Sequence, residues 1–141
     1  MDWLSCKRTK MVKEVKIDKN PINSLINSAS KKLITADSIK LNENTASSKV
    51  SLTYDALREL LEAIAIEEGF KIYNHECYCA FLKEIIKETN LGDKFDDFRK
   101  IRNSINYYGK DVSVEEASFL IKNMLILIKE IKQKRRSTSK K

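Results

Sequence analysis

The sequence has 141 residues, 33% of them charged, with only three glycines and one proline, which favours a single helical domain over a β-sandwich or barrel. It contains no run of eighteen apolar residues, so no transmembrane helix is predicted, and its start lacks the apolar segment of a secretion signal. We therefore expect a cytoplasmic protein that does not associate with membranes.

Apolar residues recur at helical spacing after residue 19, and no strand signal is strong enough to interrupt them. Asn20 followed by Pro21 is typical of a helix start. Gly92 and Gly109 are typical of helix ends, and Ser113 begins a capping box. The expected helices cover residues 20–41, 49–73, 75–91, 93–108 and 114–134.

The chain should therefore form an all-α domain, an antiparallel bundle of four to five helices over residues 20–134. The net charge of +7 comes from the segments outside it. Residues 1–19 are expected to be basic and loosely ordered, and residues 135–141 to form a basic disordered tail. Such a tail attracts phosphate backbones or only keeps the protein soluble, and the sequence leaves both possibilities open.

The three cysteines cannot all pair within one chain, and their spacing does not predict a disulfide framework. His75 and Cys79 are four residues apart and would share a helix face, so the two side chains are potential metal ligands. A structural zinc ion needs four ligands, however, and the chain has no second histidine. We expect neither a metal nor a cofactor, and we interpret Cys77 and Cys79 as small residues that fill a packing face.

The fourth expected helix carries two stripes of different character. At 100° per residue, one side of this helix forms the core stripe, which consists of Phe95, Phe98, Ile101, Ile105 and Tyr108. The second stripe consists of Arg99, Arg102, Asn103 and Asn106, with Tyr107 at its border. Guanidinium and amide groups are suited to bind phosphate, and a phenol can stack on a base. Alternatively, the arginines pair with acidic residues of adjacent helices and the stripe is structural.

The fifth expected helix has apolar residues on two opposite sides. Its core stripe accounts for most of them, but Phe119 and Ile126 lie seven residues apart on the other side. A two-residue apolar spot on an outer face suggests a contact with a second copy or another partner. Single exposed apolar residues are nevertheless common on monomeric proteins.

The segment IRNSINYYGK, late in a small helical chain, resembles the HEPN family (higher eukaryotes and prokaryotes nucleotide-binding). The family's motif is an arginine, usually followed by a small polar residue, with a histidine four to six residues after the arginine. Arg102 and Asn103 match the first two positions, and the helix order extends the resemblance over about residues 20–135. The resemblance implies a homodimer that binds RNA or nucleotide phosphate at the cleft between its two copies.

Tyr107 stands where active members of that family carry the histidine, five residues after Arg102. In those members the arginine and histidine cleave RNA without a metal ion, often within toxin–antitoxin modules. Histidine suits the role of base because it titrates near neutrality, whereas tyrosine, with a pKa around 10, is a poor base at pH 7. The resemblance thus implies a degenerate catalytic pair, Arg102 and Tyr107, and favours binding over cleavage.

Three functional hypotheses follow from these patterns. The first is a homodimeric HEPN-like domain that binds RNA or nucleotide phosphate through the polar stripe. The second is a non-catalytic interaction module whose stripe contacts a protein partner, such as a minimal nucleotidyltransferase. The third is a nucleic-acid binder that uses its basic tail, with the bundle as scaffold. The role of His75 stays open, because its distance from Arg102 cannot be read from the sequence.

Overall fold

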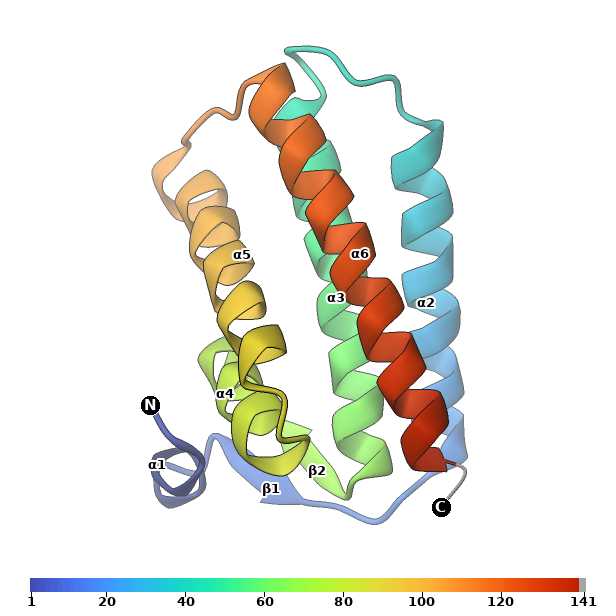
Figure 1. Ribbon diagram of the computed structural model, residues 1–141, viewed down its shortest axis with the longest axis vertical. Coiled ribbons are helices and arrows are strands. Elements are labelled where there is room, and N and C mark those ends of the chain that lie inside the picture. The colour runs from blue at the N-terminus through green and yellow to red at the C-terminus, as the bar shows by residue number, and fades with distance from the viewer. Residues whose placement is uncertain (140–141) are drawn as a thin grey trace.

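Four long helices dominate the computed structural model, which describes residues 1–139 (Figure 1). The α-helices of this part of the chain are α1 (Trp3–Arg8), α2 (Lys19–Ser38), α3 (Ala46–Glu67), α4 (His75–Ala80), α5 (Thr89–Tyr108) and α6 (Val114–Ser139). A π-helical segment, η1 (Phe81–Ile85), continues α4, and two short strands, β1 (Val12–Glu14) and β2 (Phe70–Ile72), form a small sheet. The predicted all-α class is confirmed.

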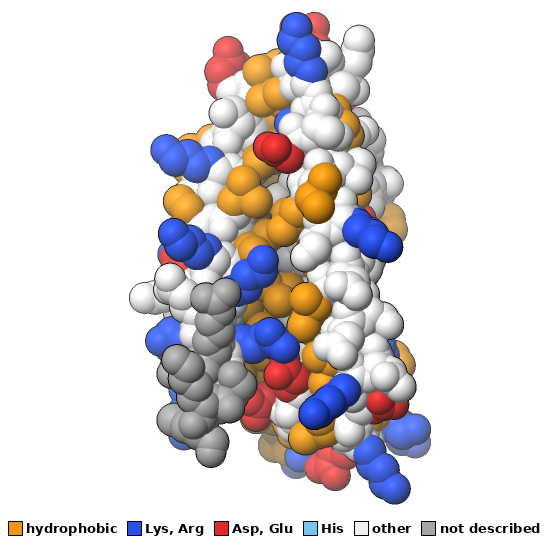
Figure 2. Space-filling view, turned by 90° about the vertical axis from the view of Figure 1, so that its right-hand side faces the viewer, with side chains coloured by type: hydrophobic (Ala, Val, Ile, Leu, Met, Phe, Trp, Pro, Cys, Tyr) orange, Lys and Arg blue, Asp and Glu red, His pale blue; other side chains and the backbone are white. Residues whose placement is uncertain are grey.

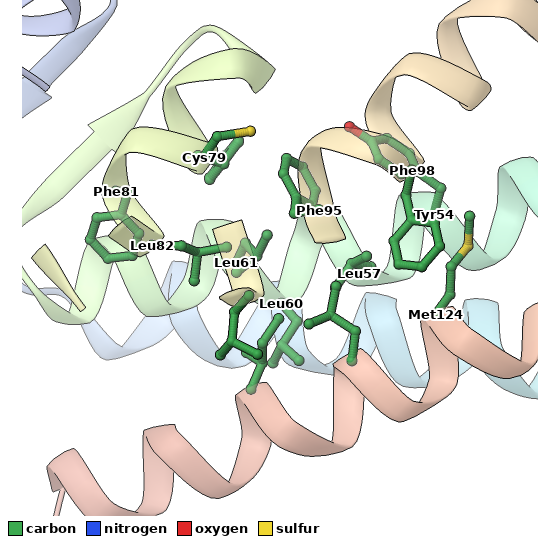
Figure 3. Close-up of a cluster of buried hydrophobic side chains, with 14 of the residues drawn as sticks. Tyr54, Leu57, Leu60, Leu61, Cys79, Phe81, Leu82, Phe95, Phe98 and Met124 are labelled. Atoms are coloured by element: carbon green, nitrogen blue, oxygen red, sulfur yellow. The ribbon is translucent and has the colours of Figure 1, made fainter. Parts of the chain in front are cut away.

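Helices α2, α3, α5 and α6 run along one axis with alternating direction, and α1, α4 and the strands lie at one end (Figure 1). Helix α3 is buried on more than one side, because α2, α5 and α6 all pack against it. Figure 3 shows the main core, where side chains from α3, η1, α5 and α6 meet. Its largest fully buried members include Tyr54, Leu57, Leu61, Phe81, Phe95 and Met124.

The N-terminal segment is ordered, contrary to the expectation for residues 1–19. Trp3 and Cys6 of α1 and Val12 of β1 are buried. The Trp3 ring packs edge-on against Phe70 of β2, with ring centroids 5.1 Å apart, and β1 pairs with β2 in antiparallel register. The expectation of no strands was also wrong, because strands of three residues are too short to show alternation in a sequence.

A disulfide bond joins Cys6 of α1 to Cys77 of α4 across a separation of 71 residues. The sequence did not predict this bond, because the spacing of cysteines does not show which distant ones meet in space. Cys79 remains a buried free thiol. Because Cys77 is in the disulfide, it cannot join His75 and Cys79 as a metal ligand.

Gly92 lies inside α5 and does not end a helix, contrary to expectation. It is buried where α5 passes the α4–η1 segment. A β-carbon at this position would lie 2.7 Å from Cγ of Lys83 and 3.0 Å from the carbonyl oxygen of Cys79. The glycine permits this close approach, and a sequence alone cannot distinguish that role from a helix stop.

Capping residues explain the ends of several helices. Asp18, not Asn20, caps α2, since its side chain accepts a hydrogen bond from the Asn20 N–H. Gly109 ends α5 in the left-handed region, with a φ of 62°. Before α6, the N–H of Glu116 donates to the Ser113 hydroxyl at 3.1 Å. The predicted glycine stop and capping box around the α5–α6 connection are thus confirmed.

Helix α6 is longer than expected, because it continues to Ser139. The tail predicted to be disordered from residue 135 is therefore helical as far as that residue, and residues 140–141 lie outside the described part of the chain. The Nε atom of Arg135 lies 2.6 Å from Oε1 of Glu67, at the end of α3. This ion pair fixes the start of the supposed tail to the bundle.

Candidate functional site

The predicted polar stripe of α5 meets α3 at the ring of Tyr54, which is fully buried. The Cζ atom of Arg102 lies 5.5 Å from the centroid of that ring, and its Nη2 lies 3.4 Å from Oδ1 of Asp55. With its side-chain oxygen turned toward Arg102, Asn106 accepts hydrogen bonds from Nε at 3.0 Å and Nη2 at 3.2 Å. A ring, a carboxylate and an amide thus position the Arg102 guanidinium.

Arg99 lies one turn earlier on α5 and binds Asp96 of the same helix. Its Nε and Nη2 lie 3.0 Å and 2.7 Å from Oδ1 of Asp96. Asp96 also pairs with Lys100 at 3.1 Å and accepts a hydrogen bond from the Cys79 thiol at 3.4 Å. Burial alone would raise the pKa of Asp96, but hydrogen bonds from these three neighbours outweigh it and lower the pKa to about 2.

Cys79 is therefore not a reactive nucleophile in this site. Burial and the nearby Asp96 carboxylate raise the pKa of its thiol to about 12. The thiolate is the nucleophilic form of cysteine, and at neutral pH it is almost absent here. The role of Cys79 is to pack in the core and donate a hydrogen bond to Asp96.

His75, at the start of α4, reaches the same tyrosine. Its Nδ1 atom lies 3.2 Å from the Tyr54 hydroxyl. Burial raises the pKa of Tyr54, so the hydroxyl stays protonated and can donate to Nδ1. Burial, together with the charges of Arg58 and Arg102, lowers the pKa of His75 to about 4. The imidazole is accordingly neutral at pH 7.

The basic residues around this site pair with a small number of carboxylates. Asp55, Glu62 and Asp96 are shared among five basic residues. The five are Arg58, Lys71, Arg99, Lys100 and Arg102. The structural alternative for the stripe holds in part, since the arginines do have carboxylate partners. The charges of Arg58, Arg99 and Arg102 all act on His75, and cations grouped in this way can attract an anion.

We call Arg58, Arg99 and Arg102, with His75 and the Tyr54 ring, the arginine cluster. Arg99, Arg102 and Asn106 were predicted from the spacing on α5. Tyr54, Arg58 and His75 were missed as site residues because they come from α3 and α4. The only signal for the α3 residues is their spacing, since Tyr54 and Arg58 are one turn apart and share a face.

The remaining predicted residues lie at the edge of the arginine cluster or outside it. Asn103 is half-buried on α5, and Tyr107, near the end of that helix, is 72% exposed. Phe119 and Ile126 are 69% and 45% exposed and belong to α6, which contributes nothing to the arginine cluster. The structure thus brings together part of the predicted set and separates the α6 pair from it.

No helix within residues 1–139 is long and apolar enough to cross a membrane. The same residues contain no group of three or more His, Cys, Asp or Glu side chains placed to hold a metal ion. Comparison of the sequence with protein-family models and with curated proteins finds no match.

Proposed function

We propose that this chain is a HEPN-like helical domain that binds the phosphate groups of RNA or a nucleotide at the arginine cluster. The observation that carries the proposal is the position of Arg102 on the Tyr54 ring. The charges of Arg58 and Arg99, like that of Arg102, act on the Tyr54 hydroxyl, so three guanidinium groups lie around one tyrosine. Guanidinium groups bind phosphate through paired N–H donors.

The proposal includes a homodimer whose cleft lies beside the arginine cluster. Tyr107 and Tyr108, at the end of α5, are 72% and 84% exposed. Exposed phenol rings beside a phosphate-binding face can stack on unpaired bases. A second copy that approached along α5 would enclose the same rings.

The expected activity is binding without efficient RNA cleavage. Tyr107 occupies the position of the base in the resembled motif, and tyrosine is a weak base at neutral pH. His75 is a neutral imidazole at pH 7, but its Nδ1 faces the Tyr54 hydroxyl rather than open solvent. These features support a site that holds phosphate more readily than it activates a ribose hydroxyl.

A fluorescence-anisotropy titration with labelled single-stranded RNA, in EDTA, tests this function. Wild-type affinity should fall steeply with salt. Arg102→Ala should weaken binding roughly tenfold or more, since a hydrogen bond to a charged group contributes about 1.5–3 kcal/mol. Arg8→Ala, on the exposed side of α1, removes one charge elsewhere and should change little. Equal affinities of wild type and Arg102→Ala would exclude the arginine cluster as the site.

Removal of residues 136–141 separates the arginine cluster from the basic tail as the source of binding. The tail hypothesis predicts that binding is lost, whereas the proposed site predicts that most of it remains. A longer deletion would damage the bundle, because Arg135 pairs with Glu67 and Ile131 is in the core. Gel analysis of the same incubations shows whether the RNA is cleaved.

A further inference from the structure

The outward side of α6 exposes several large apolar side chains to solvent. Phe119 is 69% exposed, and Leu125 and Ile126 are each 45% exposed. The opposite side of the helix is buried in the core through residues such as Met124 and Leu127. A contiguous patch of exposed apolar side chains on a protein surface often marks an interaction site. We call this side of the helix the α6 outer face.

A hollow lies on each side of this ridge. The first, of about 480 Å³, is bounded by α6, the start of α3 and Leu41 of the α2–α3 connection, and Ile121 and Leu125 line it. The second, of about 570 Å³, lies between α5 and α6. Ile126 lines both. Figure 2 shows hydrophobic side chains in a groove between α6 and α2, with Lys and Arg side chains on both sides and acidic ones mostly near the ends of the molecule.

The charged residues that line the two hollows are almost all basic. Lys49, Lys122 and Lys129 line the first hollow, which has no carboxylate among its lining residues. Lys94 and Lys100 line the second, together with one aspartate. Lys94 and Lys100 have carboxylate partners, but within residues 1–139 no ion pair involves Lys122 or Lys129. Their charges are therefore available to a partner.

We propose that the α6 outer face binds an amphipathic helix of another protein, with apolar side chains in the first hollow and Asp or Glu side chains opposite Lys122 and Lys129. The first hollow follows α6 over residues 118–129, about 17 Å at 1.5 Å per residue. This length matches three turns of a bound helix, whose apolar residues would recur every three to four positions. The inference does not depend on the proposed phosphate site, to which α6 contributes no residue.

A second copy of this chain is a poorer occupant, because symmetric contact through this face would place its lysines against one another. Nucleic acid is also a poorer occupant, since phosphate contacts would leave Leu125 and Ile126 in water. An acidic amphipathic helix satisfies both the apolar floor and the basic rim. Charge complementarity thus selects the partner.

Two synthetic helical peptides test this proposal in calorimetric titrations with the full-length protein at physiological salt. Both carry leucine at every third or fourth position over four turns, and they differ only in flanking Glu or flanking Lys. The Glu peptide should bind saturably with one peptide per chain, and the Lys peptide should not. Leu125→Ala should lower the affinity for the Glu peptide at least fivefold. Ile34 is an apolar residue on α2 that is 70% exposed, and Ile34→Ala should leave the affinity unchanged.

A charge reversal makes the test specific for this face. The double variant Lys122→Glu with Lys129→Glu should lower the affinity for the Glu peptide at least tenfold and should bind the Lys peptide with measurable affinity. Lys7→Glu with Lys13→Glu changes the net charge equally at exposed positions elsewhere and should leave the preference intact. Equal binding of both peptides, no effect of the reversal, or a dimer of the free chain that Leu125→Ala dissociates would each overturn the proposal.

Discussion

The guanidinium of Arg102 lies over the ring of Tyr54, with Cζ 5.5 Å from the ring centroid, while its ion pair with Asp55 spans 3.4 Å. The ring contact involves a fully buried partner, whereas both members of the ion pair are partly exposed. A partly exposed ion pair of this length contributes little to stability, about 0–1 kcal/mol. Tyr54 therefore contributes to the position of Arg102, and the proposed site predicts that a phosphate displaces Asp55.

Asp55→Asn is expected to strengthen RNA binding, because it removes the carboxylate that competes with phosphate for Arg102 and so raises the net charge of the face by one. The affinity should rise roughly threefold or more at low salt, and the dependence of log K on log salt should become steeper. Anisotropy titrations over a salt series measure both quantities. Asp97→Asn, on the exposed side of α5, is the matched control. A weaker complex with Asp55→Asn at unchanged stability would refute competition at Arg102.

His75 should make the fold sensitive to mild acid. The pKa of His75 is about 4 in the folded protein and 6.5 in the unfolded chain. Between pH 6.5 and pH 4 the unfolded chain therefore binds a proton that the folded chain does not. The free energy of unfolding is fully retained above pH 6.5 and should fall as the pH drops toward 4. Urea unfolding at a series of pH values measures this loss.

His75→Gln provides the comparison for that measurement. The variant lacks the titrating group, so its free energy of unfolding should change less between pH 6.5 and 4 than that of the wild type. Asp96, with a pKa lowered to about 2, acts in a separate window below pH 4, where both proteins should lose stability alike. Parallel curves for the two proteins above pH 4 would show that His75 is not the sensor.

Helical periodicity predicted contacts between residues of the same helix. The α5 stripe is an example, since Arg102 and Asn106 are one turn apart and do contact each other. The same pattern placed Tyr108 in the core stripe, but the residue is the last of α5 and is 84% exposed. Burial at a helix end depends on neighbours that periodicity does not include.

Relationships between distant segments could not be predicted in the same way. His75 and Arg102 come together at Tyr54, a residue of a third helix, and Cys6 meets Cys77 where α1 packs against α4. The acidic partner of Arg102 was foreseen as a possibility but not as Asp55 in particular. Tertiary contact, which a single sequence does not encode as a local pattern, decides all three.

Gly92 and Gly109 should differ in their tolerance of asparagine, although alanine should destabilise the protein at both positions. At Gly92 any β-carbon meets the Cys79 carbonyl at 3.0 Å, and overpacking of this kind costs about 1–3 kcal/mol. The gain in helix propensity, about 1 kcal/mol, offsets only part of that. At Gly109 nothing lies within 4 Å, but φ is 62°, a conformation that asparagine tolerates better than alanine does.

Urea unfolding of four variants distinguishes these two causes. Gly92→Ala and Gly92→Asn should both lower the free energy of unfolding, by about 1 kcal/mol or more. Gly109→Ala should lower it by about 1 kcal/mol, whereas Gly109→Asn should stay closer to the wild type. A Gly92→Ala variant as stable as the wild type would mean that α5 can move away from η1 without cost.

The Cys6–Cys77 bond should contribute strongly to stability, because it closes a loop of 71 residues. Restriction of the unfolded chain by a loop of this length is worth about 2–4 kcal/mol. Reduction, or Cys6→Ser, should therefore lower the free energy of unfolding by this amount, and reducing agent should have no further effect on Cys6→Ser. Because the bond anchors α4, which carries His75, the same treatments should also weaken RNA binding at the arginine cluster.

Thiol titration of the denatured, unreduced protein tests the bond itself. One reactive thiol, that of Cys79, is expected per chain before reduction, and three after it. Cys79→Ser keeps a hydrogen-bond donor for Asp96 and should abolish the single signal while leaving the stabilising effect of the disulfide intact. Three thiols in the unreduced protein would show that Cys6 and Cys77 only pack together, and the predicted loss of stability on reduction would then not occur.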